Sequence, residues 1–137
     1  MAVVTFDFDD TLTLTQWDNE DECFKFIGPN MHTCIALKKH INMGDEVHIV
    51  TSRTGPDMDR EGHIHMNGQP SVLSFLSGHL NDVRDKIAGV HFTSGALKTQ
   101  KLAELKASRH FDDDYCELEA LPEGCVGVLV STLHGLA

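Results

Sequence analysis

Short apolar runs alternate along the chain with longer segments in which apolar residues recur at helical spacing. We expect strands at the apolar runs, which lie at residues 2–7, 47–50, 90–92, 110–111 and 125–130. Runs that are apolar at nearly every position are typical of parallel strands buried on both faces. The alternation of strands and helices therefore predicts an α/β domain with a mainly parallel five-stranded sheet. Ligands of such sheets bind outside the carboxyl ends of the strands.

The segments between the runs carry signals for helices and loops. Helices are expected at residues 29–43, 71–87 and 96–107, with a helical turn at 117–121. The apolar face of the first helix consists of Met31, Ile35, Leu37 and Ile41, and Gly44 can end this helix. Ser71 can cap the second helix. Residues 13–28 mix aromatic and acidic side chains, which suggests a loop or a small hairpin. Residues 54–70 are polar and marked by glycine and proline, so we expect a long loop there.

Length and composition favour one folded domain over residues 1–137. No apolar stretch approaches the roughly 20 residues that a transmembrane helix needs. The N-terminus also lacks the basic region that opens a signal peptide. The four cysteines are scattered without metal-binding spacing; they are Cys23, Cys34, Cys116 and Cys125. We therefore expect free thiols and a cytoplasmic protein without membrane contact.

The formal net charge of the chain is -10. Such a charge repels polyanions at long range and argues against broad nucleic-acid binding. It does not argue against one phosphate end held by local groups. Part of the excess negative charge would belong to an acidic metal site, whose carboxylates count as uncompensated until a cation binds.

Groups able to bind phosphate or metal follow three of the predicted strands. In chain order they are Asp7, Asp9, Thr51, Ser52, Asp112 and Asp113. Lys98 opens the helix that leads to the last pair. Because parallel strands end at one edge of a sheet, we expect all of these side chains to converge there.

The chemistry of such an edge is that of phosphoryl transfer. Several carboxylates within a few ångströms cannot all ionise without compensation. Mg²⁺ supplies it, since this ion usually takes one or two carboxylates, several waters and a substrate phosphate. A lysine nearby can offset the nucleophile's charge and hold a phosphoryl oxygen. One aspartate can then attack phosphorus to form an aspartyl-phosphate, while a second gives a proton to the leaving oxygen.

Four segments resemble the ordered motifs of the haloacid dehalogenase (HAD) superfamily. They are DFDDTL at 7–12, VHIVTSR at 47–53, a lysine near 98 and HFDDD at 110–114. They occur in the order of the superfamily, three of them at strand ends, and span nearly the whole chain. The resemblance implies a Rossmann-like, three-layer α/β/α sandwich. Its first strand would be central, flanked by the strands that end at Thr51 and Asp112.

The resemblance also implies a role for each matching residue. Asp7 would be the nucleophile and a metal ligand. Asp9 would be the general acid and base and would offer its backbone carbonyl to the metal. Thr51 would hydrogen-bond the phosphoryl group, with Ser52 and Arg53 as further substrate contacts. An exposed or ion-paired arginine fits the position of Arg53 equally well.

The remaining motif residues would complete the site. Lys98 would stabilise the phospho-aspartate, and Asp112 and Asp113 would complete the Mg²⁺ site. Lys101 is the alternative motif lysine; we prefer Lys98, which begins the helix and lies 14 residues before Asp112 (112 − 98). Asp10 stands where the superfamily often has glycine, and aspartate tolerates turn conformations better than most residues.

The acidic residue at position 9 narrows the implied reaction. In the superfamily an acid two residues past the nucleophile goes with phosphatases and phosphomutases, so the resemblance implies a phosphoric monoester hydrolase. A response-regulator receiver domain is disfavoured, because its lysine follows the fifth strand and no lysine or arginine follows Asp113 here. A catalytically silent binding or regulatory module on the same fold stays open.

The spacing of the motifs leaves little room for a cap domain over the site. Residues 13–29 are too few for a helical cap, and between Arg53 and Lys98 only the loop at 54–70 is spare. An open site suits a large substrate, unless an oligomer partner covers it. The stretch from Pro29 through TSRTG is similar to the phosphatase domains of polynucleotide kinase-phosphatases and to small phage-type nucleotide phosphatases. We therefore expect a nucleotide or nucleic-acid phosphate end as substrate, with a small phosphorylated metabolite or a phosphoprotein as alternatives.

Overall fold

The computed structural model describes residues 1–55 and 69–131. Its main sheet has five strands in the order β5–β4–β1–β6–β7, and every neighbouring pair is parallel. The strands are β1 Val3–Phe6, β4 Glu46–Thr51, β5 Gly89–Phe92, β6 Arg109–Asp112 and β7 Val126–Leu129. The predicted parallel sheet is confirmed, and its order is consistent with a Rossmann-like fold whose first strand is central.

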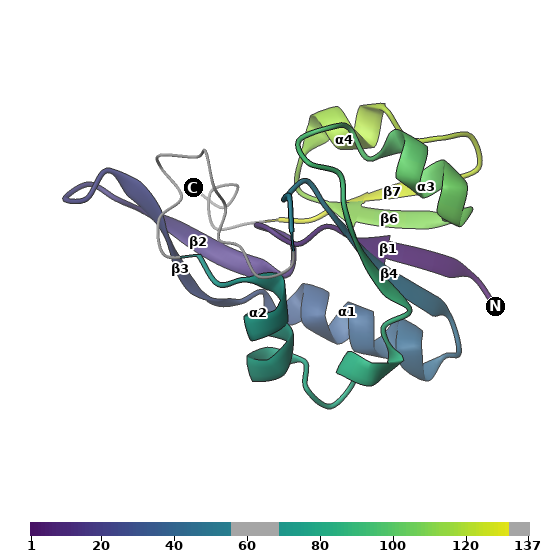
Figure 1. The fold of residues 1–137 in the computed structure, drawn as a ribbon, viewed down its shortest axis with the longest axis horizontal. Helices are drawn as coiled ribbons and strands as arrows, with labels where there is room; N and C mark the ends of the chain where they lie inside the picture. Colours follow the sequence, from purple (N-terminus) through teal and green to yellow (C-terminus); the bar gives the residue numbers. More distant parts are fainter. Residues whose placement is uncertain (56–68, 132–137) are drawn as a thin grey trace.

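Helices cover both faces of this sheet (Figure 1). They are α1 Met31–Asn42 and α2 Val72–His79 on one face, and α3 Thr99–Leu105 and α4 Tyr115–Glu119 on the other. Strand residues alternate between the two cores, as the strand period of two requires. Phe6 faces α1 and α2, and its ring stacks on Phe111 of β6 with 4.4 Å between centroids. Val50 faces the other way and packs against Leu102 of α3.

Helix α1 occupies the predicted segment but buries only part of the predicted face, Leu37 and Ile41. Thr33, Cys34 and Leu37 are buried against the sheet, whereas Met31 and Ile35 are each 59% exposed. The buried side chains lie at i, i+1 and i+4, which is one side of a helix. The prediction was wrong for Met31 and Ile35, because the apolar pattern alone does not say which side meets the sheet.

The predicted caps at two helix ends are confirmed. Gly44 follows α1 with φ of +87°, a conformation that glycine adopts without the penalty of a Cβ atom. Ser71 precedes α2, and its Oγ accepts a hydrogen bond from the backbone N–H three residues later at 3.1 Å.

Two predicted helices are shorter than expected. Helix α2 ends at His79, and a separate 3₁₀ turn follows at Arg84–Lys86. The intervening Asn-Asp pair at 81–82 favours turns over a continued helix. Of the segment predicted at 96–107, only Thr99–Leu105 is helical, and Lys106 ends it in the left-handed conformation with φ of +57°.

A β-hairpin follows the first strand and confirms the hairpin alternative for this segment. Its strands are β2 Thr13–Asp18 and β3 Cys23–Pro29, which pair antiparallel. The hairpin extends away from the main sheet (Figure 1). Residues 13–29 therefore contain no helical cap. Most of the loop predicted at 54–70 lies outside the described residues.

The last strand was predicted to be buried, and this is wrong. Val126 and Leu129 of β7 are 59% and 49% exposed. As the final strand in the sheet order, β7 pairs among the described residues with β6 alone. Edge position explains the exposure that the apolar sequence does not reveal.

Two expectations from composition can also be compared with the structure. All four cysteines are free thiols, as predicted. In the part of the chain that the structure describes, no helix combines the length and apolar character needed to cross a bilayer.

Candidate functional site

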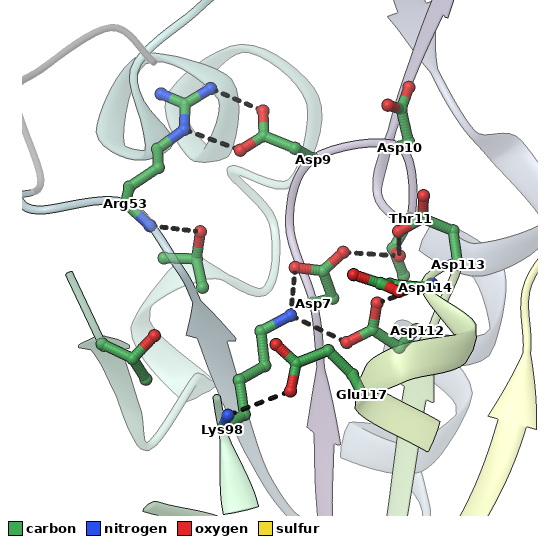
Figure 2. Close-up of polar contacts among 12 residues, drawn as sticks. Asp7, Asp9, Asp10, Thr11, Arg53, Lys98, Asp112, Asp113, Asp114 and Glu117 are labelled. Carbon is green, nitrogen blue, oxygen red and sulfur yellow. Dashed lines mark hydrogen bonds and ion pairs between the residues drawn. The ribbon is translucent and has the colours of Figure 1, made fainter. Parts of the chain in front are cut away.

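Asp7 lies directly after the central strand β1, where polar groups from distant segments meet it (Figure 2). Its backbone N–H donates to the carbonyl of Phe111 at 2.9 Å, which carries the β1–β6 pairing one residue beyond the strand. Its Oδ1 accepts a hydrogen bond from Lys98 Nζ at 2.7 Å, and its Oδ2 accepts one from Thr11 Oγ1 at 2.9 Å. The carboxylate is buried, so its charge depends on these partners.

Asp112 and Asp113 stand beside Asp7, at the end of the neighbouring strand β6. One carboxylate oxygen from each of the three residues lies within 4.8 Å of the other two. Lys98 Nζ also donates to Asp112 Oδ2 at 2.7 Å. One ammonium group therefore bridges the carboxylates at two adjacent strand ends.

The two candidate motif lysines occupy different environments. Lys98 is buried immediately before α3 and points into the acidic cluster. Lys101 lies farther along the helix, and its Nζ pairs with Glu104 Oε2 at 2.8 Å in solvent. Of the two, Lys98 is the one that meets Asp7.

The acidic cluster holds more carboxylates than its lysine can neutralise. Burial, reinforced by the charge of Asp7, raises the pKa of Asp113 to about 9. Burial also raises the pKa of Asp7, against the opposing charge of Lys98. For Asp112 the effect of burial is outweighed by the hydrogen bond from His110 and the charge of Lys98, so its pKa lies below the ordinary value. At neutral pH Asp113 therefore keeps a proton, and it is hydrogen-bonded to Asp7.

The donor set of this cluster fits a hard divalent cation. A proton held between two carboxyl groups relieves their repulsion, and a cation can do the same for all three. Oxygen ligands in this number suit Mg²⁺, which completes its coordination with waters and phosphate oxygens. Asp7, Asp112 and Asp113 are therefore the residues that would hold the ion. Asp9 was predicted to reach the metal through its backbone carbonyl, and its carboxylate is not part of this group.

Asp9 instead points toward Arg53, away from the cluster (Figure 2). Arg53 Nη2 donates to Asp9 Oδ1 at 2.7 Å, and Nε donates to Oδ2 at 2.9 Å. The guanidinium also donates to the carbonyl of Pro70 at 2.8 Å and lies 4.9 Å from the ring centre of Phe8. Of the two roles open to Arg53, the structure has the internal ion pair and not a free substrate contact.

The two hydroxyl residues after β4 differ in access to the site. Thr51 is fully buried, and its Oγ1 accepts a hydrogen bond from the backbone N–H of Arg53 at 3.3 Å. Ser52 lines the pocket above the cluster. Of the two hydroxyl residues, Ser52 is thus the one that lines the pocket.

The cluster opens into a pocket of about 310 Å³. Its lining is Asp7, Asp9, Asp10, Ser52, Lys98, Asp112, Asp113, Asp114, Tyr115 and Glu117. Neither Thr51 nor Arg53 is among the described residues of this lining. The pocket therefore presents one lysine, one serine and one tyrosine among carboxylates.

Asp10 takes the backbone conformation that the glycine of the resembled motif would take. Its φ is +60°, in the left-handed region that aspartate visits more readily than most residues. Thr13 Oγ1 accepts a hydrogen bond from its backbone N–H at 3.0 Å, and Oδ1 accepts one from Thr15 Oγ1 at 2.5 Å. The departure from glycine is thus accommodated by local hydrogen bonds.

Three side chains at the site were missed at the level of sequence. Thr11 donates to Asp7, and its Oγ1 also lies 3.2 Å from Asp113 Oδ1. Glu117 Oε1 accepts from the backbone N–H of Lys98 at 3.0 Å, and buried His110 contacts Asp112. The strand period of two places His110 and Asp112 on one face and was a usable signal for His110. Nothing in the sequence pointed to Glu117, whose contact depends on how α4 packs beside Lys98.

No protein-family model matches this chain, and a search of the curated proteins finds no match to it.

Proposed function

We propose that this protein is a Mg²⁺-dependent phosphomonoesterase of HAD type that forms an aspartyl-phosphate on Asp7. The observation that carries the proposal is the contact of Lys98 with both Asp7 and Asp112, beside Asp113, at the carboxyl ends of two central strands. A nucleophile, a cation partner and a set of metal ligands are thereby within reach of one bound phosphoryl group.

The reaction proceeds in two displacements. In the first, a carboxylate oxygen of Asp7 forms a bond to phosphorus, and the bond from phosphorus to the ester oxygen breaks. Asp9 gives a proton to the departing oxygen. In the second, water attacks phosphorus, Asp9 takes a proton from that water, and the bond to Asp7 breaks to release inorganic phosphate.

The remaining residues stabilise charge on the transferring group. Lys98 donates to phosphoryl oxygens and offsets the charge of Asp7. Ser52 offers a hydroxyl from the pocket wall. Mg²⁺, held by Asp7, Asp112 and Asp113, would neutralise the phosphate and orient it for in-line attack.

Asp9 must leave its ion pair, at least partly, to act as an acid. Both of its oxygens accept hydrogen bonds from the Arg53 guanidinium, which occupies the positions where a donated proton would sit. The same guanidinium fork also fits a phosphoryl group. Entry of substrate phosphate beside Arg53 can therefore compete for the fork and release Asp9.

We favour a nucleotide or nucleic-acid phosphate end as the substrate. The absence of a helical cap in residues 13–29 supports an open approach to the pocket. The acidic lining and the net charge of -10 favour a short substrate over a long polyanion. A phosphorylated metabolite or phosphoprotein is the alternative within the same chemistry.

The decisive test is hydrolysis of phosphomonoesters by the purified protein. Release of phosphate from an aryl phosphate should require Mg²⁺ and stop in a chelator; full activity in the chelator would refute the metal mechanism. A panel of nucleotides, 3′- and 5′-phosphorylated oligonucleotides and phosphorylated metabolites then ranks the substrates by kcat/KM.

A catalytically silent module that binds a phosphorylated ligand is the second candidate. The ion pair between Asp9 and Arg53 favours it, because both carboxylate oxygens of the proposed acid are engaged. Binding of Mg²⁺ and a phosphorylated ligand without turnover of any substrate on the panel would support this reading over the first.

A further inference from the structure

His110 is fully buried in β6 and contacts one of the proposed metal ligands. Its Nε2 lies 2.8 Å from Asp112 Oδ2, and its Nδ1 lies 2.7 Å from Thr5 Oγ1. Thr5 is the register partner of His110 on the neighbouring strand β1. The three side chains therefore form a hydrogen-bonded line across two central strands that ends at the pocket.

The contacts decide which ring nitrogen carries a proton. Asp112 also accepts a hydrogen bond from the ammonium of Lys98, and an ionised carboxylate can only accept. The 2.8 Å contact therefore requires an N–H on Nε2 of His110. The hydroxyl of Thr5 lies 2.7 Å from Nδ1 and has the Arg109 carbonyl as a second acceptor at 3.3 Å, so it can donate to Nδ1 or accept from it while it holds the ring.

We propose that His110 is a positioning residue for the metal site, acting through Asp112, and that Thr5 holds its ring in place from the other side. This inference depends on the metal site of the proposed function. Asp112 Oδ2 accepts from both His110 and Lys98, and Oδ1 accepts from the backbone N–H of Asp114 at 3.0 Å. The carboxylate is thus oriented before any cation arrives, and a ligand that need not reorient binds the cation more tightly.

Two substitutions at this position separate positioning from mere packing. His110→Gln keeps an amide nitrogen as many bonds from the backbone as Nε2, so it can still donate to Asp112. His110→Asn keeps one only at the place of Nδ1, so it can reach Thr5 but not Asp112. Both introduce a buried amide, which makes them a matched pair.

Mg²⁺ affinity of the Mg²⁺-free protein, measured by titration calorimetry without substrate, is the primary readout. We expect His110→Gln to bind within about threefold of the wild type, and His110→Asn to bind roughly 10- to 100-fold more weakly. Equal affinities of the two variants would overturn the proposal. So would a wild-type protein that does not bind Mg²⁺.

A measurement on the wild type guards against variants that fail to fold. Long-range ¹H–¹⁵N spectra of protein labelled at histidine report which ring nitrogen is protonated. We expect His110 to show a protonated Nε2. A ring with its proton on Nδ1 alone would overturn the positioning role.

Phosphatase assays form a separate arm that tests the proposed function. If Mg²⁺ binding follows the expected pattern in the two variants but the wild type hydrolyses no phosphomonoester, the proposed function fails and the positioning role stands. If hydrolysis depends on Mg²⁺ but both variants bind it like the wild type, the positioning role fails and the function stands.

Discussion

The guanidinium of Arg53 holds both carboxylate oxygens of Asp9, at 2.7 Å through Nη2 and at 2.9 Å through Nε. Both side chains are almost completely buried, at 1% and 5% exposure. Arg53 follows β4 and Asp9 follows β1, so the pair joins two strand ends beside the pocket. The hydrogen bond from Arg53 Nη1 to the Pro70 carbonyl extends this link to the segment that leads into α2. Any acid–base role of Asp9 therefore depends on its ion pair with Arg53.

Arg53→Met should lower the free energy of unfolding by about 3 kcal/mol, because removing one partner strands a buried charge. Asp9→Asn removes the charge itself, so the double variant should be more stable than the sum of the single losses predicts, by about 1–3 kcal/mol. Urea denaturation of the four proteins measures this coupling. Strictly additive losses would mean that the ion pair contributes no stability of its own.

Asp9→Asn should slow hydrolysis of a substrate with a poor leaving group by roughly 10²- to 10⁴-fold, since the leaving oxygen then departs without a proton. An aryl phosphate, whose leaving oxygen needs little protonation, should lose much less in this first step. The comparison is made with single-turnover kinetics on both substrates. An unchanged rate with the poor leaving group would contradict the role of Asp9.

Asp7→Asn should reduce phosphate release to background, because the amide cannot form the aspartyl-phosphate. Its fold should persist, and circular dichroism checks this. Trapping of phosphorylated protein after an acid quench should succeed for the wild type and fail for the variant. An active Asp7→Asn protein would place the nucleophile elsewhere.

Lys98→Met should lower kcat by roughly 10²-fold, as the loss of one transition-state donor does in other enzymes. The matched control is Lys101→Met, three residues along, where the lysine pairs with Glu104 in solvent. We expect this control to stay within about twofold of the wild type, because exposed ion pairs contribute little. Comparable losses in both variants would argue against a specific role for Lys98.

The Mg²⁺-free protein should lose stability as the pH rises from about 4 toward about 9. The pKa of Asp113 rises from an ordinary 3.8 to about 9 in the fold, through burial and the charge of Asp7. Between these values the folded state holds a proton that the unfolded state releases, so rising pH favours unfolding. Asp112 has a lowered pKa, so its effect lies below this window.

In the proposed site Mg²⁺ would replace that proton, so its stabilising effect should be larger at pH 8 than at pH 5. Thermal unfolding with Mg²⁺ or chelator at both pH values measures the shift in Tm. Asp113→Asn lacks the titrating group and should show a flatter pH dependence without metal. The same slope in this variant as in the wild type would assign the effect to other groups.

Several features of the fold could be predicted because they depend on local pattern. The five apolar runs became five parallel strands, since such runs can bury both faces only inside a covered sheet. The caps at Gly44 and Ser71 were predictable from backbone chemistry alone. The errors concern which surface is covered: Ile35 and Leu129 are apolar yet exposed, because burial depends on what packs against them.

The sequence by itself determined that Asp7, Thr51 and Asp112 end strands of one sheet, because parallel strands bring their carboxyl ends to a common edge. It could not determine whether Lys98 or Lys101 enters the cluster, because this depends on the residue at which α3 begins. Nor could it place Arg53 on Asp9 or His110 on Asp112, because such contacts depend on rotamers and on the register between strands. Those pairings exist only once the sheet is assembled, when buried charges must find partners among the groups that packing has brought near.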